Sequence, residues 1–352
     1  MYFNIAFIIS CSILLSLPLS AQESQHKERL DSIICYVPRE RYKEKKVFYY
    51  DRQGKISQIA EYQWRRGTDG WRPYSLTQCK YDAEGRNIVW EFNRLHGRTW
   101  QTSERIEAEY DEKGNISKLI EYMAPDSKSC YIYERGADGH LEEIIFQTLK
   151  NGEWETIVRY QYTCDEAGNV TSYILNEKRE DKWVKVRNMR YGYDANGNKT
   201  SEARYYMPLD KSGWMLADSM TYSYDADGRI TRRYRYSKDY SSKQWIAKTE
   251  RVYTYDDKGG NVEMVEAFLN PYMASTKTVM EYDPSLPAAQ VRGLQKEPLL
   301  HWQLNAYYLD LADDLTQYTN KIKSHRIIDL KETTAYDMSE DATFYYSPIS
   351  AE

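Results

Sequence analysis

The sequence predicts an all-β fold of tandem β-hairpin repeats, each about 30 residues long, forming a long antiparallel meander or a curled, solenoid-like sheet. Three observations predict it. A Tyr-Asp-x-x-Gly element recurs along the chain, a Trp stands ten residues before most copies, and the intervening residues alternate with a period of two.

Residues 1–21 are predicted to be a secretory signal peptide. The apolar stretches Ile5–Ile9 and Ile13–Leu15 are followed by Pro18, and small residues precede a cut after Ala21. An uncleaved membrane anchor is the less favoured alternative, because a span needs about 20 apolar residues and this run is shorter. We expect no transmembrane span after signal removal. The mature chain is then exported, to the periplasm, the outer surface or the extracellular space.

The rest of the chain divides into three parts. We assign residues 22–40 to an N-terminal lead-in, 41–283 to the repeat array, and 284–352 to a C-terminal segment with a hairpin that caps the array. The composition favours an array over two globular domains. With 34 Tyr and 29% charged residues, a core of aliphatic side chains would be thin for this length.

Nine copies of the repeat are recognised, spaced 25 to 31 residues apart. Seven keep both the Asp and the Gly, although one has Cys164 in place of the Tyr. The fourth copy in chain order keeps only Gly139, and the ninth has Tyr282-Asp283 followed by Pro284. The predicted turn residues are Asp51, Gly54, Asp82, Gly85, Asp111, Gly114, Gly139, Asp165, Gly168, Asp194, Gly197, Asp225, Gly228, Asp256 and Gly259.

Each copy is interpreted as a half-buried strand that ends in a tight turn. Met189, Tyr191 and Tyr193 alternate with polar or small residues, which places the aromatic side chains on one face. In Asp-x-x-Gly, the Asp accepts bonds from backbone N–H groups of a type I turn. The Gly takes the left-handed conformation that closes a hairpin through a bulge.

The Tyr-Asp-x-x-Gly-Asn element resembles the YD repeats of bacterial Rhs and teneurin-like proteins, whose hairpins form large spiralling sheets. The longer unit, with Gly-x-Trp or Lys-Trp at its start as in Gly152-Glu153-Trp154, is similar to tyrosine-rich repeat proteins exported by Bacteroidetes. The resemblance covers about residues 40 to 350. It implies fold and export, and it carries no catalytic residue across.

Two readings of the repeated tryptophans stay open. Either each indole covers the end of a hairpin and is buried against the next copy, which is the favoured reading, or the indoles form a ladder that stacks on sugar rings. The six residues are Trp71, Trp100, Trp154, Trp183, Trp214 and Trp245. Four cysteines follow the signal, and buried thiols are favoured over bridges: Cys35, Cys79, Cys130 and Cys164.

Nothing in the sequence indicates an enzyme, a cofactor or a metal site. The five His are isolated, and Asp225-Ala226-Asp227-Gly228 lacks the ligand series of a calcium loop. The formal charge of −5 is mixed in sign, so nucleic acid is not expected as a partner. We therefore predict an exported, non-enzymatic scaffold for protein or surface interaction. The alternative is a carbohydrate-binding surface built on the repeat Trp and Tyr residues, and the sequence does not name the partner.

Overall fold

The computed structural model describes twelve stretches of the chain: residues 28–37, 42–65, 67, 70–124, 127–208, 213–238, 244–257, 261–268, 276–287, 291–292, 320–329 and 340–349. The predicted signal peptide and the turn residue Gly259 lie outside these stretches. So does most of the segment between the ninth Tyr-Asp element and residue 320.

The described residues form antiparallel β-strands joined in series, which confirms the all-β hairpin-repeat class. The strands are β1 (Glu28–Val37), β2 (Tyr42–Tyr50), β3 (Ile56–Arg65), β4 (Arg72–Tyr81), β5 (Asn87–His96), β6 (Thr99–Tyr110), β7 (Ile116–Ala124), β8 (Ser127–Arg135), β9 (Leu141–Lys150), β10 (Glu153–Cys164), β11 (Val170–Arg179), β12 (Lys182–Tyr193), β13 (Lys199–Tyr206), β14 (Met215–Tyr224), β15 (Ile230–Lys238), β16 (Trp245–Tyr255), β17 (Asn261–Phe268), β18 (Thr276–Pro287), β19 (Val291–Arg292), β20 (Asn320–Asp329) and β21 (Glu340–Pro348).

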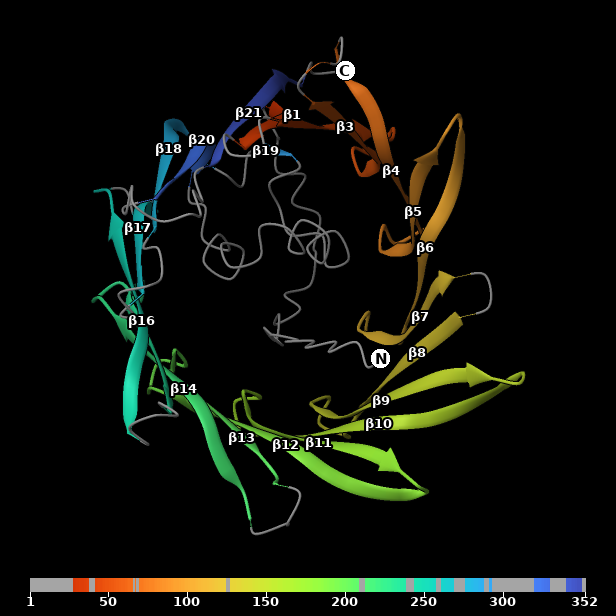
Figure 1. The fold of residues 1–352 in the computed structure, drawn as a ribbon, viewed down its shortest axis with the longest axis vertical. Coiled ribbons are helices and arrows are strands. Elements are labelled where there is room, and N and C mark those ends of the chain that lie inside the picture. Colours follow the sequence, from red (N-terminus) through yellow and green to blue (C-terminus); the bar gives the residue numbers. More distant parts are fainter. Residues whose placement is uncertain are drawn as a thin grey trace.

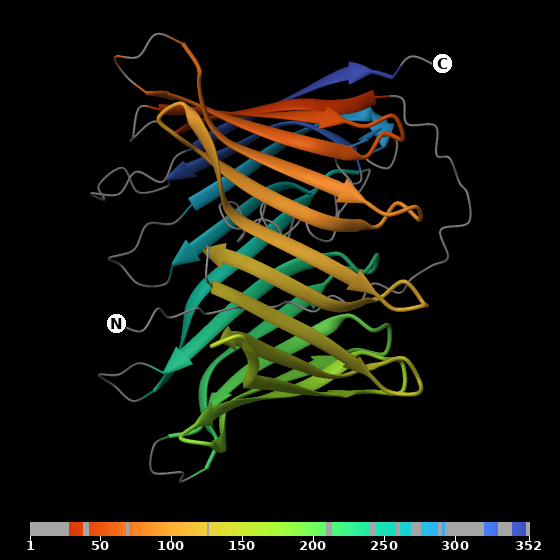
Figure 2. The same cartoon turned by 90° about the vertical axis from the view of Figure 1, so that its right-hand side faces the viewer.

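The expectation of an open meander or solenoid is wrong, because the sheet closes on itself. Strands β1 to β18 pair in chain order, β18 pairs with β20, β20 with β21, and β21 with β1. Figure 1 shows the strands following one another round a ring, and Figure 2 shows them running obliquely across its wall. Closure leaves no strand edge within this ring of twenty described strands, which removes the need for a cap. The two-residue β19 adds a short parallel pairing to β1.

The hairpin expected within residues 284–352 is formed by β20 and β21, but it joins the two ends of the sheet. In each ordinary copy, the Tyr of Tyr-Asp pairs with the residue two positions after the turn glycine, as Tyr193 pairs with Lys199. The same pairing joins Tyr282 to Ile322 and Tyr346 to Leu30. Strands β18 and β20 therefore make the ninth copy. A tenth copy, not recognised in the sequence, consists of β21 and β1, which come from opposite ends of the chain.

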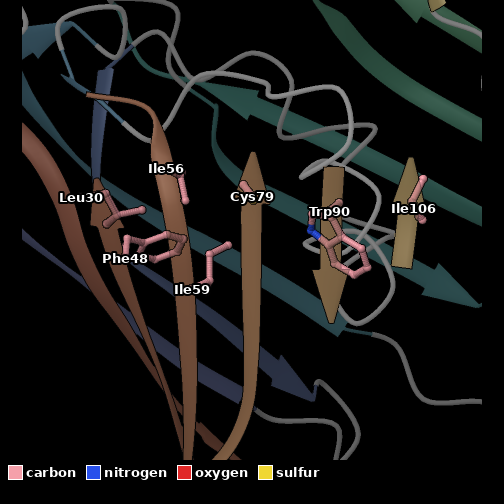
Figure 3. Packing of buried hydrophobic residues seen from close by; sticks show 7 residues of the cluster. All are labelled: Leu30, Phe48, Ile56, Ile59, Cys79, Trp90 and Ile106. Atoms are coloured by element: carbon pink, nitrogen blue, oxygen red, sulfur yellow. The ribbon is translucent and has the colours of Figure 1, made fainter. Parts of the chain in front are cut away.

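Apolar side chains cluster on one face of the closed sheet. Figure 3 shows seven of them, contributed by six successive strands: Leu30, Phe48, Ile56, Ile59, Cys79, Trp90 and Ile106. Trp90 retains only 1% of its exposure and stacks against Phe92 with ring centroids 6.0 Å apart. Complete burial of a large apolar side chain contributes roughly 1.5–3 kcal/mol. None of the four cysteines in the described part of the chain forms a disulfide, and Cys35, Cys79 and Cys130 are buried.

Candidate functional site

The predicted turn residues from Asp51 to Gly228 lie at tight turns along one edge of the ring. At the turn that begins with Asp194, the N–H of Gly197 donates to the Asp194 carbonyl at 3.1 Å, and Gly197 has a φ of 81°. The Asp194 carboxylate accepts from the N–H groups of Asn196 and Asn198, and from the Asn198 side chain. These bonds, the one from the Asn198 amide foremost, lower the pKa of Asp194. The carboxylate therefore organises the turn.

The same turn recurs in the other copies. The N–H of the glycine donates to the carbonyl of the Asp at 3.0–3.1 Å in the copies that begin at Asp51, Asp82, Asp111, Asp165 and Asp225. In the copy without Asp, Gly136 accepts this bond from Gly139, and the carboxylate of Asp138 accepts from the N–H of His140. Asp256 ends the eighth copy, and its glycine partner lies beyond the described residues.

In most copies the tyrosine of the Tyr-Asp element binds the preceding copy. Its hydroxyl donates to the backbone carbonyl of the residue two positions after the glycine of that copy. The ladder between neighbouring copies stops short of this point, so the hydroxyl supplies the last bond of the interface. The bonds are Tyr81 to Ile56 at 2.8 Å, Tyr110 to Asn87 at 2.8 Å, Tyr193 to Val170 at 2.9 Å, Tyr224 to Lys199 at 2.7 Å and Tyr255 to Ile230 at 2.6 Å.

We call this bond, from a Tyr-Asp hydroxyl to a carbonyl of the preceding copy, the tyrosine latch. It is also present where the ring closes. Tyr50 donates to the Leu30 carbonyl and Tyr346 to the Ile322 carbonyl, both at 2.6 Å. In the copy with cysteine, the Cys164 thiol takes the place of the hydroxyl and lies 3.9 Å from the Leu141 carbonyl.

Cations add a second contact between copies. Arg86, directly after a turn glycine, lies over the Tyr110 ring of the next copy at 4.8 Å, and Arg229 lies over the Tyr255 ring at 5.0 Å. Sequence reasoning missed this contact and the latch. The sequence did contain an indication of the cation contact: in some copies a basic residue directly follows the glycine, and a Tyr-Asp element follows one repeat later.

Cross-strand pairing divides the side chains of the sheet between two faces. We call the face that carries the Tyr of Tyr-Asp the tyrosine face, and the opposite face the tryptophan face. On the tyrosine face, Met189 lies opposite Tyr173 and Arg204. On the tryptophan face, Trp183 lies opposite Lys178, and further along the same strand Arg190 lies opposite Ser172. The tyrosine face holds the buried clusters, including the one formed by Tyr173, Leu175 and Met189.

The six repeat tryptophans lie at the edge of the ring opposite the Asp-x-x-Gly turns. They stand within the first two residues of alternate strands or directly before them, and alternate strands run in the same direction, so the indoles share one edge and one face. We call this set the tryptophan rim: Trp71, Trp100, Trp154, Trp183, Trp214 and Trp245.

The favoured reading of these indoles as buried covers is wrong for four of them. Trp100, Trp154, Trp183 and Trp245 retain 40%, 40%, 44% and 42% of their exposure. At the rim, each hairpin extends beyond the strands that pair with it on either side. The next copy therefore does not cover the indole. Arg159 lies over the Trp183 ring at 5.3 Å, and the indole keeps much of its surface in solvent.

The contacts around Trp71 extend the rim sideways. Trp71 meets Trp64 edge to face with centroids 5.9 Å apart, and Lys43 lies over the Trp64 ring at 5.4 Å. Trp64 is 39% exposed and was not part of the repeat pattern. Sequence reasoning missed it because it stands at the end of a strand instead of the start.

Two acids lie among the apolar side chains of the tyrosine face. Burial, with Glu121 as the next cause, raises the pKa of Glu104 to about 7, and Arg94 partly opposes this. Burial also raises the pKa of Glu121, whose carboxylate accepts a bond from Ser129 at 2.9 Å. The Oε1 atom of Glu104 is buried and has no hydrogen-bond partner within the described structure.

Two further observations concern the described stretches alone. They contain no group of three or more His, Cys, Asp or Glu side chains placed to hold a metal ion. They also contain no helix long and apolar enough to cross a membrane.

Comparisons with known proteins found similarity to solved structures alone. No family model matches the sequence, and no curated protein matches it. A DUF3836 family protein from Bacteroides vulgatus has 19% identity and a TM-score of 0.23, with 26% of this chain and 89% of that chain covered. A porin-like protein from Bacteroides uniformis has 10% identity and a TM-score of 0.34, with 63% and 95% covered. The TcdB2-TccC3 structure has 11% identity and a TM-score of 0.31, with 85% and 18% covered. Because these scores lie below 0.5, the functional proposal rests on the residues of this chain.

Proposed function

We propose that this protein is an exported, non-enzymatic binding protein, and that its closed sheet is a scaffold which presents the tryptophan rim to a carbohydrate. The observation that carries the proposal is the exposure of the rim indoles, which is 40–44% at four positions held in a fixed register. A side chain needed only for packing would be covered by the neighbouring copy. Indoles displayed at the starts of β4, β6, β10, β12, β14 and β16 offer a series of flat apolar surfaces to a polymer.

The rest of the repeat supports a scaffold role. The turn carboxylates are engaged by backbone N–H groups, and the Tyr-Asp hydroxyls are engaged by carbonyls of the preceding copy. These recurring polar groups are therefore committed to holding the ring. The rim indoles remain as the recurring side chains with free surface, which favours stacking over chemistry.

The test is a glycan array probed with the mature chain, residues 22–352, and with a Trp154→Ala, Trp183→Ala, Trp245→Ala variant. Each aromatic contact is worth about 0.5–1.5 kcal/mol, so each lost indole should weaken binding by about 2- to 10-fold. Tyr49→Ala is the matched control. Tyr49 is 44% exposed, and it lies near the end of its strand at the Asp-x-x-Gly turns, away from the tryptophan rim. Glycan binding that is equal in the triple variant and the control would overturn the proposal. Binding to proteins but to no glycan would restore the protein-interaction reading.

A further inference from the structure

One part of the ring carries a charge opposite to that of the whole chain. From Lys182 to Tyr255, which covers β12 to β16, the sequence has 15 Lys and Arg against 8 Asp and Glu, a formal +7. The complete chain carries a formal −5. Positive charge is therefore concentrated in one part of the ring, and we call β12–β16 the basic wall.

The tyrosine face of this wall uses its cations internally. Arg204 and Arg235 both pair with Asp218, and Arg251 pairs with Glu266 at 2.7 Å. Arg251 is 2% exposed. These charges are matched by buried or half-buried carboxylates, so they support the sheet.

The tryptophan face of the same strands presents cations to solvent. Lys185 and Arg190 lie on β12, and Lys238 lies on β15 opposite Trp245. All three side chains are exposed, and none has a carboxylate within ion-pair distance among the described residues. Arg232 on this face is also exposed and pairs with Glu250 at 3.2 Å.

Aromatic rings lie between these cations on the same face. Tyr205 lies opposite Asn188 and beneath Arg190, whose guanidinium is 4.9 Å from the ring centroid. Tyr234 and Tyr236 lie on β15 with centroids 5.9 Å apart. Three rim indoles, those of Trp183, Trp214 and Trp245, border the patch. We call this surface the basic aromatic patch.

We propose that the basic aromatic patch binds an acidic polysaccharide, with sugar rings on the indole and phenol faces and carboxylate or sulfate groups on the exposed cations. This rests on the proposed function and names its ligand class. A guanidinium offers paired N–H donors to a carboxylate, and an ammonium offers a compact charge. The aromatic rings would take up the apolar faces of the sugars.

The expected location of the chain favours a polysaccharide over a nucleic acid as the ligand. The predicted signal peptide sends it out of the cytoplasm, where acidic glycans are the abundant polyanions. Outside the basic wall, the chain has an excess of acidic residues that would repel a polyanion extending past β12–β16. The site is therefore local, and it is matched to an acidic chain that crosses a few strands.

The experiment is a titration of the mature chain with polygalacturonate, with neutral galactan and with a single-stranded DNA oligonucleotide, at low and high NaCl. The test variant is Lys185→Gln, Arg190→Gln, Lys238→Gln. The control is Lys80→Gln, Arg98→Gln, Lys323→Gln, which removes the same charge from exposed cations elsewhere on the ring. We expect tight, salt-sensitive binding of polygalacturonate that falls about 10-fold or more in the test variant and is almost unchanged in the control.

The other outcomes separate the two proposals. Equal affinity of the test variant and the control for polygalacturonate would overturn the acidic-ligand assignment. Galactan bound as tightly as polygalacturonate, and lost only in the tryptophan variant, would overturn it too while leaving the carbohydrate proposal standing. Tighter binding of DNA would replace polysaccharide by nucleic acid. Failure to bind either polysaccharide would overturn both proposals.

Discussion

The tyrosine latch provides a direct test of how the copies are held together. In the triple variant Tyr193→Phe, Tyr224→Phe, Tyr255→Phe, three adjacent interfaces lose a hydroxyl that donates to a backbone carbonyl at 2.6–2.9 Å. The rings stay in place, so packing is preserved. Each carbonyl lies beyond the last backbone pair between the two copies and loses the donor that the hydroxyl provided.

The expected cost follows from the number of bonds removed. One intramolecular hydrogen bond contributes about 0.5–1.5 kcal/mol net, so three separate bonds give about 1.5–4.5 kcal/mol. The lower end applies where water reaches the carbonyl, because these hydroxyls are only partly buried. We expect the free energy of unfolding to fall by this amount.

The measurement is urea unfolding followed by circular dichroism, with the m-value checked for constancy so that the midpoint reports stability. Tyr345→Phe is the control, because Tyr345 is 46% exposed and lies on β21 away from the three interfaces. Hydrogen exchange should show the greatest loss of protection in β11 to β16. A triple variant with the same midpoint as the control would refute the latch as a stabilising contact between copies.

Three further outcomes are expected. Gly197→Val should destabilise more than Asn198→Ala in thermal unfolding, because Gly197 has a φ of 81° that a β-branched residue adopts only with strain, and equal shifts in melting temperature would contradict the turn geometry. Trp183→Ala should cost well under the 3–5 kcal/mol typical of a buried Trp, since the indole is 44% exposed, and a loss of that full size would mean that the ring is buried in solution. Glu104→Gln should raise stability more at pH 8 than at pH 5, whereas the exposed control Glu112→Gln should not. The pKa of Glu104 is raised to about 7, so the folded state favours the neutral carboxyl. Its contribution to stability is complete below the ordinary carboxyl pKa and is lost as the pH rises through 7. Identical pH profiles of the two Gln variants would contradict the burial of this carboxyl.

The local part of the fold was accessible from the sequence because its causes are local. The period-two alternation of Met189, Tyr191 and Tyr193 places them on one face of a strand, and that face is where the structure has them. The Asp-x-x-Gly spacing predicts a turn that four consecutive residues make among themselves, and in residues 194–197 these bonds are present.

The candidate site was accessible only in part. The register of each Trp with its Tyr-Asp element placed the indoles at equivalent positions, but not whether a neighbour covers them. Exposure depends on how adjacent hairpins diverge at the rim, which is a property of the whole sheet. The basic aromatic patch was hidden for a similar reason. Lys185 and Lys238 are 53 residues apart, and only the pairing of β12 to β15 puts them on one face.

What the sequence by itself determined is the hairpin, its turn and its repetition, since these follow from spacing within one copy. Closure was decided by the tertiary structure alone. It requires the accumulated twist and tilt of many strands to bring β21 beside β1, where Tyr346 lies opposite Leu30 and the Ser347 hydroxyl donates to Asp31 at 3.0 Å. Each copy interacts chiefly with its neighbours, so no single copy carries information about whether the series ends in two free edges or in a ring. The tenth copy shows this most clearly, because its two strands come from opposite ends of the chain and become one repeat only when the sheet has closed.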